Sequence, residues 1–186
     1  HGRRILLMET VKLGQSPFHI PRIALGGVPF GREIDEQTSW MILDYALDHG
    51  INLIDTAEAY GGGNAKLGRK LSLGVDDERE VSDEMHSSEK IIGRWLQAKN
   101  CRDRVQICTK FSTGGQRDQV LQSLQASMKR LQTDYIDIYM LHRPFPDVPL
   151  RETLETLSEE VRAGRIRTLG CSNFPAATFQ EAQAVT

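Results

Sequence analysis

The sequence predicts an α/β fold built on a parallel sheet, and three observations point to it. Short apolar runs start near residues 23, 52, 105, 135 and 166, and turn residues bound each of them, which is typical of buried strands. Segments with apolar residues at i, i+3 and i+4 separate these runs and predict amphipathic helices. Four of the five strand starts follow a spacing of about 30 residues, which is the size of one βαβ unit.

Length and composition are those of a globular domain. The chain has 186 residues, 39% hydrophobic and 26% charged, which allows one sizeable core and excludes a disordered or collagen-like chain. No apolar run is long enough for a transmembrane helix, and the run at residues 5–8 is too short for a secretory signal, so we expect no membrane partner. A net charge of −2 without a basic run indicates no nucleic-acid partner. The 3 cysteines lack metal-ligand spacing, so we expect no metal site and a reducing compartment, the cytoplasm or a plastid.

The first elements have recognisable boundaries. Residues 5–21 hold two apolar runs around a turn and predict a hairpin that leads into the first strand, 23–27. Asp35 stands where an N-cap is needed, and Gly50 closes the first helix. Strands and helices then alternate over the ranges 52–57, 88–96, 105–110, 117–131, 135–142, 150–161 and 166–171, and a last helix starts near Pro175.

The interval between the second and third strands is longer than the others. The excess lies in residues 62–87, which carry six acidic side chains between Asp76 and Glu84. We interpret residues 62–87 as an inserted, solvated acidic loop, and the glycine run 61–63 as a flexible segment. Because the loop follows a strand, it would lie on the face where βα folds place their chemistry, but a surface excursion without a role fits equally well.

The parallel sheet is either doubly wound or closed into a barrel. A doubly wound nucleotide fold carries Gly-x-Gly-x-x-Gly after its first strand, and residues 26–31 read GGVPFG instead. A barrel is therefore favoured. Because a barrel of eight units needs roughly 250 residues, we expect residues 1–186 to be one C-terminally truncated barrel domain of about five βα units.

Four ionisable residues follow successive strands of the predicted sheet. Asp55 ends the second strand, Tyr60 lies in the loop after it, Lys110 ends the third strand and His142 ends the fourth. Each has an ordinary interpretation when taken alone. Asp55 could cap a helix or hold a loop, and Tyr60 could be an interface aromatic. Lys110 could be a solvated charge at the rim, and His142 could be a hydrogen-bonded histidine in a turn. Because the carboxyl ends of barrel strands converge on one mouth, the four together predict a shared site.

The four side chains suit carbonyl reduction. An ammonium beside a phenol stabilises the phenolate and lowers the pKa of the hydroxyl. An aspartate beside the lysine would hold it charged, and a histidine donor would orient a substrate oxygen. Together they form a general acid that protonates a developing alkoxide, while a bound cofactor provides the hydride.

Several motifs resemble the aldo-keto reductase family over nearly the whole chain. The longest is residues 50–61, GINLIDTAEAYG, which is similar to the family pattern G-x-N-x-x-D-T-A-x-x-Y-G. Residues 88–93, 109–110, 141–144 and 170–174 match other family segments in order and spacing. The resemblance is closer to the bacterial, plant and potassium-channel β-subunit branch. It implies a (β/α)8 TIM barrel whose N-terminal end is plugged by the hairpin.

The resemblance also implies an activity. It makes Asp55, Tyr60, Lys110 and His142 the catalytic tetrad, with Tyr60 as the proton donor. The protein would be an NADP-dependent oxidoreductase that reduces an aldehyde or ketone to an alcohol. Its partner would be a small-molecule carbonyl substrate, and an oligomer stays open.

The implied cofactor is NADP(H). By resemblance, Ser172 and Asn173 hydrogen-bond the nicotinamide carboxamide, and Asp55 lies near the nicotinamide ribose. From the residues alone, the Ser172-Asn173 pair is equally well an N-cap of the last helix. In the family, the last three units grip the phosphate end of the cofactor, so no residue of this chain distinguishes NADPH from NADH.

Two other functions stay open at this point. One is a cofactor-sensing regulatory subunit of the same fold, and the other is an inactive truncated fragment. The tetrad alone does not separate them from a reductase, because one fold carries many functions.

Overall fold

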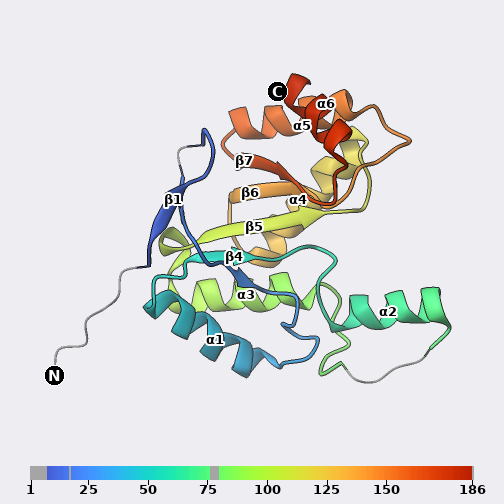
Figure 1. Cartoon of the computed structure of the whole chain (residues 1–186). Coiled ribbons are helices and arrows are strands. Elements are labelled where there is room, and N and C mark those ends of the chain that lie inside the picture. Colours follow the sequence, from blue (N-terminus) through green and yellow to red (C-terminus); the bar gives the residue numbers. More distant parts are fainter. Residues whose placement is uncertain (1–7, 17, 76–79, 186) are drawn as a thin grey trace.

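A computed structural model describes residues 8–16, 18–75 and 80–185 (Figure 1). Its centre is a parallel sheet of 5 strands in the order β3-β4-β5-β6-β7, so each strand lies beside its sequence neighbours. The strands are β3 (Leu25–Gly26), β4 (Leu53–Asp55), β5 (Gln106–Phe111), β6 (Ile136–Leu141) and β7 (Ile166–Cys171). A doubly wound sheet has a point where the strand order reverses, whereas the strands here follow one another in sequence order, as in a barrel wall. The predicted incomplete α/β barrel is therefore confirmed.

Helices alternate with these strands, and some of them cover one face of the sheet. The helices are α1 (Glu36–Asp48), α2 (Gly62–Leu73), α3 (Ser87–Lys99), the short 3-10 helix η1 (Arg102–Arg104), α4 (Arg117–Leu131), α5 (Leu150–Arg162) and α6 (Ala176–Val185). α1, α3, α4 and α5 pack side by side and enclose the larger core, whose bulkiest members include Trp95, Phe111 and Tyr139. Burying a phenylalanine such as Phe111 contributes about 1.5–3 kcal/mol, so this layer carries much of the stability. Within the described ranges, no helix is long and apolar enough to cross a membrane.

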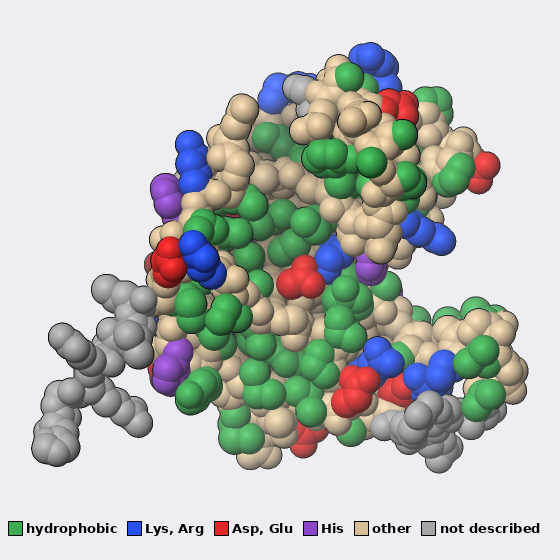
Figure 2. Space-filling view, in the orientation of Figure 1, with side chains coloured by type: hydrophobic (Ala, Val, Ile, Leu, Met, Phe, Trp, Pro, Cys, Tyr) green, Lys and Arg blue, Asp and Glu red, His purple; other side chains and the backbone are tan. Residues whose placement is uncertain are grey.

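A hairpin lies at the end of the sheet where the strands begin. It is formed by β1 (Thr10–Lys12) and β2 (His19–Pro21), which pair antiparallel. The side-chain amide of Gln106, at the start of β5, donates a hydrogen bond to the His19 backbone carbonyl at 2.9 Å, so the hairpin lies at the amino ends of the strands. Figure 2 shows hydrophobic side chains gathered in the hollowed centre of one face of the molecule. The predicted hairpin is confirmed over its described residues; 5–7 and 17 lie outside them.

Hairpin and sheet share a second, smaller core. It contains two hairpin residues and four strand residues: Leu13, Ile20, Leu53, Cys108, Ile138 and Met140. The strands are thus apolar on both faces, as expected for a parallel sheet enclosed by helices and a plug.

Local signals set several boundaries as expected. The Asp35 carboxylate accepts a hydrogen bond from the Thr38 amide at 2.8 Å and caps α1. Gly50 follows α1 with φ 77°, a conformation in which glycine carries no side-chain penalty. α4 has the bounds that its apolar periodicity predicts.

The predicted loop at 62–87 is wrong over its first half. Residues 62–73 form helix α2, which ends at Gly74 in the left-handed conformation, and Figure 1 shows α2 set apart from the other helices. Its apolar side chains stay exposed, Leu67 at 46% and Leu71 at 78%, and only Gly62 and Gly63 are buried. Leu67 and Leu71 lie one helical turn apart, but the glycine run before them and the acidic residues after them favour a loop from the sequence alone.

The glycine run 61–63 is not a flexible segment either. A Cβ atom on Gly62 would lie 1.9 Å from the Ser82 carbonyl oxygen, and one on Gly63 would lie 2.3 Å from the Asp83 carbonyl oxygen. Real Cβ atoms essentially never come that close. The glycines therefore allow the start of α2 to pack directly against the returning backbone.

Candidate active site

Strand register brings Asp55 and Lys110 together at the carboxyl ends of β4 and β5. Asp55 is in register with Cys108, and Lys110 lies two residues further along β5 on the same face. The Lys110 ammonium lies 2.7 Å from Asp55 Oδ1 and donates a hydrogen bond to the Thr56 carbonyl at 2.9 Å. The lysine side chain is only 8% exposed, whereas that of Asp55 is 35% exposed.

Tyr60 completes this contact from the loop after β4. Lys110 Nζ lies 3.3 Å from the Tyr60 hydroxyl oxygen and 4.8 Å from the centroid of its ring. An ammonium can only donate, so the tyrosine oxygen accepts this bond and its own proton is directed elsewhere. Two backbone bonds hold the loop: the Tyr60 amide donates to the Ala57 carbonyl, and the Glu58 amide donates to the Lys110 carbonyl, both at 3.0 Å.

Lys110 keeps its charge in this site. Burial alone would lower its pKa, but the hydrogen bond and charge of Asp55 outweigh burial, so the pKa of Lys110 lies above its usual value. The group that touches the Tyr60 hydroxyl is therefore a permanent cation at neutral pH.

His142 follows β6 and faces Tyr60. Its backbone amide donates to the Phe111 carbonyl at 2.9 Å, and its ring meets the Tyr60 ring edge to face at a centroid distance of 5.7 Å. Burial, followed by the charge of Lys110, lowers the pKa of His142 below 6.5. The imidazole is thus neutral at pH 7, with one nitrogen able to donate a hydrogen bond.

Ser172 and Asn173 reach the site through the backbone of His142. The Asn173 amide nitrogen donates to the His142 carbonyl at 2.9 Å and to Ser172 Oγ at 3.0 Å. The Ser172 amide donates to the Leu141 carbonyl at 2.8 Å, which continues the pairing of β7 with β6. Both residues precede α6, which begins at Ala176, and the Asn173 side chain binds the end of β6 rather than this helix. The helix-capping interpretation of Asn173 is therefore not supported.

Glu58 is a residue of this site that the sequence analysis missed. Its carboxylate is buried and accepts hydrogen bonds from the Ser112 amide at 2.6 Å, the Ser112 hydroxyl at 3.2 Å and the Thr113 hydroxyl at 2.8 Å. These bonds join the loop that carries Tyr60 to the loop after Lys110. One feature of the sequence could have indicated this role: Glu58 is a charged residue between Ala57 and Ala59, two residues before Tyr60.

Replacing Glu58 should disturb the site without removing any of its reacting groups. In the protein at its natural length, we expect Glu58→Ala to lower kcat for a carbonyl substrate by about 10-fold or more, because small misplacements of reacting groups are costly. Glu58→Gln retains an acceptor oxygen and should recover most of the rate. Steady-state kinetics of both variants check this, and an alanine variant with wild-type kcat would exclude a positioning role.

Comparison with known proteins places this geometry in a family. The model of the Aldo/keto reductase family matches residues 22–186. The chain is 35% identical over 180 residues to Aldo-keto reductase YhdN of Bacillus subtilis, covering 90% of this chain and 47% of that protein. It is 32% identical over 196 residues to Protein tas of Escherichia coli, covering 89% and 52%. The chain belongs to the aldo/keto reductase family.

Solved structures agree with this assignment. The thermostable aldo-keto reductase Tm1743, in complex with the inhibitor epalrestat, superposes with a TM-score of 0.76 at 32% identity, covering 96% of this chain and 59% of that one. An aldo/keto reductase of Klebsiella pneumoniae in complex with NADP and acetate gives 0.75 at 29% identity, covering 97% and 55%. The chain spans about half the length of the curated relatives it matches. Those relatives are bacterial, so they give no support to a plastid location.

Proposed function

We propose that the protein containing this chain reduces an aldehyde or ketone to an alcohol with NADPH, and that Tyr60 is the general acid. One observation carries the proposal: a buried lysine contacts both the Asp55 carboxylate, at 2.7 Å, and the Tyr60 hydroxyl, at 3.3 Å. Family membership supports the reaction class. Since the chain spans about half of its relatives, the activity is proposed for the protein at its natural length.

The residues present suit the cofactor's carboxamide end. Ser172 offers a hydroxyl and Asn173 an amide, and both lie next to His142 at the carboxyl end of β7, with Asn173 exposed. A carboxamide needs one donor and one acceptor, which this pair can supply. The half-exposed Asp55 would lie near the ribose. The complex of a Klebsiella pneumoniae relative with NADPH supports this choice of cofactor.

When bound, NADPH supplies the hydride. Tyr60 and His142 would hold the carbonyl oxygen between them, with the neutral imidazole donating a hydrogen bond. Tyr60 would then give its proton to the oxygen as negative charge develops. Lys110 would stabilise the phenolate that remains, and Asp55 would hold Lys110 in place.

The experiment compares product with cofactor consumption. The protein at its natural length is given NADPH, or separately NADH, with a panel of aldehydes and ketones, and alcohol formed per NADPH consumed is measured by chromatography. We expect a one-to-one ratio, many turnovers and a primary isotope effect with NADPH deuterated at the transferred position. A single oxidation of bound cofactor without continued turnover would favour the cofactor-sensing subunit, and an absence of alcohol would overturn the reductase proposal.

A further inference from the structure

A cavity of about 310 Å³ opens beside Tyr60, between the loop after β3 and helix α2. Its polar lining includes Arg32, Asn64, Arg69 and Ser72, together with Tyr60 itself. The cavity therefore adjoins the proposed proton donor on the side formed by the inserted segment. A substrate held by Tyr60 could extend into it.

Among the described residues, the lining of this cavity is rich in hydrogen-bond donors and holds two arginines and no carboxylate. Arg32 is ion-paired through Nε with Glu33 at 2.9 Å, and both side chains are partly exposed, at 37% and 54%. The side-chain oxygen of Asn64 accepts a hydrogen bond from the His86 backbone amide, which leaves the Asn64 side-chain nitrogen as a donor. Such a lining favours a ligand that carries acceptor oxygens and negative charge.

Arg32 is the better candidate for contacting such a ligand. Arg69 is bound to Glu80, which is 3% exposed, so its charge is largely compensated within the fold. The partner of Arg32 is more than half exposed, and a solvated pair of this kind is weak. Arg32 can therefore exchange its carboxylate partner for one on a ligand at little cost.

The backbone around Arg32 is held in place before any ligand binds. Its amide donates to the Pro29 carbonyl at 3.0 Å, and its carbonyl accepts the Val81 amide at 2.9 Å. A Cβ on Gly31 would lie 2.3 Å from Ser87 Oγ, so this turn packs directly on the start of α3.

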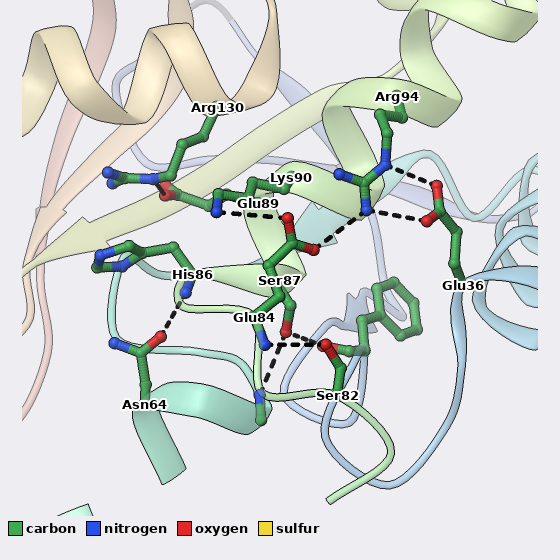
Figure 3. Close-up of polar contacts among 12 residues, drawn as sticks. Glu36, Asn64, Ser82, Glu84, His86, Ser87, Glu89, Lys90, Arg94 and Arg130 are labelled. Atoms are coloured by element: carbon green, nitrogen blue, oxygen red, sulfur yellow. Dashed lines mark hydrogen bonds and ion pairs between the residues drawn. The ribbon is translucent and has the colours of Figure 1, made fainter. Parts of the chain in front are cut away.

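Helix α2, the opposite wall, contacts a segment that is itself anchored, since Asn64 accepts a hydrogen bond from the His86 amide. Figure 3 shows Glu84 between Lys90 and Arg94 of α3, at 3.4 and 3.3 Å, while Arg94 also binds Glu36 of α1 at 2.7 Å. These contacts fasten Glu84 to the helical layer, and with it the neighbouring residues Ser82 and Asp83, whose carbonyls pack on the start of α2. A cavity with fixed walls loses little entropy when a ligand binds.

We propose that this cavity binds a carboxylate of the substrate, with Arg32 as the main contact, so that the enzyme prefers aldehydes or ketones that bear an acidic group. The planar guanidinium matches a carboxylate with two parallel hydrogen bonds. The inference rests on the proposed function for the reaction at Tyr60, but binding of the carboxylate can be measured without turnover.

The test uses matched substrates that differ only in the charged group. The protein at its natural length is assayed with 4-carboxybenzaldehyde and benzaldehyde, and with 4-oxobutanoate and butanal as a shorter pair. For at least one pair, we expect kcat/KM to favour the acid by about 10- to 100-fold, which is typical of a hydrogen bond to a charged group. Arg32→Gln should remove most of this preference through KM and leave the neutral aldehydes within about 2-fold of wild type.

Arg117→Gln is the matched control, because Arg117 is also partly exposed and ion-paired, with Glu159, but does not line the cavity. It should keep the preference for the acid. Equal kcat/KM for acid and neutral aldehydes in the wild-type protein, or a preference that survives Arg32→Gln, would overturn the inference while the reductase activity stands.

A binding measurement separates the two proposals. Calorimetric titration of the protein with NADP⁺ and 4-carboxybenzyl alcohol should show binding that weakens about 10-fold or more in Arg32→Gln, with benzyl alcohol as the uncharged reference. Arg32-dependent binding without any turnover would uphold the carboxylate site and refute the reductase proposal. No difference between the two alcohols would refute the carboxylate site.

Discussion

Tyr60→Phe should abolish carbonyl reduction and leave cofactor binding nearly unchanged. The tyrosine oxygen lies 3.3 Å from the Lys110 ammonium and is the proposed source of the proton. Because it acts on charge that develops only in the transition state, its loss should appear in kcat rather than in ground-state affinity. A positioned general acid contributes about 10²- to 10⁴-fold, so we expect a fall of that size in kcat, alongside an unchanged Kd for NADPH by fluorescence titration.

Tyr45→Phe provides the control for this experiment. Tyr45 is 66% exposed on α1 and stacks on His49, away from the carboxyl ends of the strands where the site lies. Its variant should turn over as the wild type does. If Tyr60→Phe retains more than about a third of the wild-type kcat, Tyr60 is not the acid.

Arg130→Met should destabilise the fold more than any surface substitution. Glu89 of α3 is wholly buried, and its carboxylate binds Arg130 of α4 at 2.5 Å and the Thr109 hydroxyl of β5 at 2.6 Å; Figure 3 shows Glu89 and Arg130. Removing the arginine leaves a buried carboxylate without its counter-charge, which costs about 3–5 kcal/mol. We expect that loss in the free energy of unfolding by denaturant titration, with a Tm lower by about 10 °C.

Two variants show whether the buried charge is the cause. Combining Glu89→Gln with Arg130→Met removes both charges and should recover a large part of the loss, because a neutral pair has no unpaired ion to bury. Arg117→Gln, at a solvated surface pair, should lower the free energy of unfolding far less than Arg130→Met does. A loss for Arg130→Met as small as that for Arg117→Gln would contradict the prediction.

Glu89 also links stability to the site. Thr109, which donates to it, precedes Lys110 on β5, so its side chain points to the helices while that of Lys110 points to the opposite face. The Glu89 contact therefore ties β5 to α3 and α4 directly behind the lysine that contacts Asp55 and Tyr60. A variant that loosens this tie should weaken both unfolding stability and turnover.

The sequence by itself determined the architecture, because its signals are local. Apolar runs bounded by turns mark β5 and β6 to within one residue at each end, and the helical period marks α4. The order of strands and helices then places Asp55, Tyr60, Lys110 and His142 at one end of the sheet. These inferences need only spacing along the chain and the parallel direction of the strands.

Only the tertiary structure decided that residues 62–73 form a helix and that the Glu58 carboxylate joins two loops. α2 buries only two glycines, and the glycines before it and the acidic residues after it favour a loop from the sequence alone. Gly62 must be glycine because the Ser82 carbonyl returns against it, and Glu58 is a tie because Ser112 approaches from another strand. Each of these roles depends on a partner 20 or more residues away. Proximity of that kind is set by packing and strand register, which spacing along the chain does not encode.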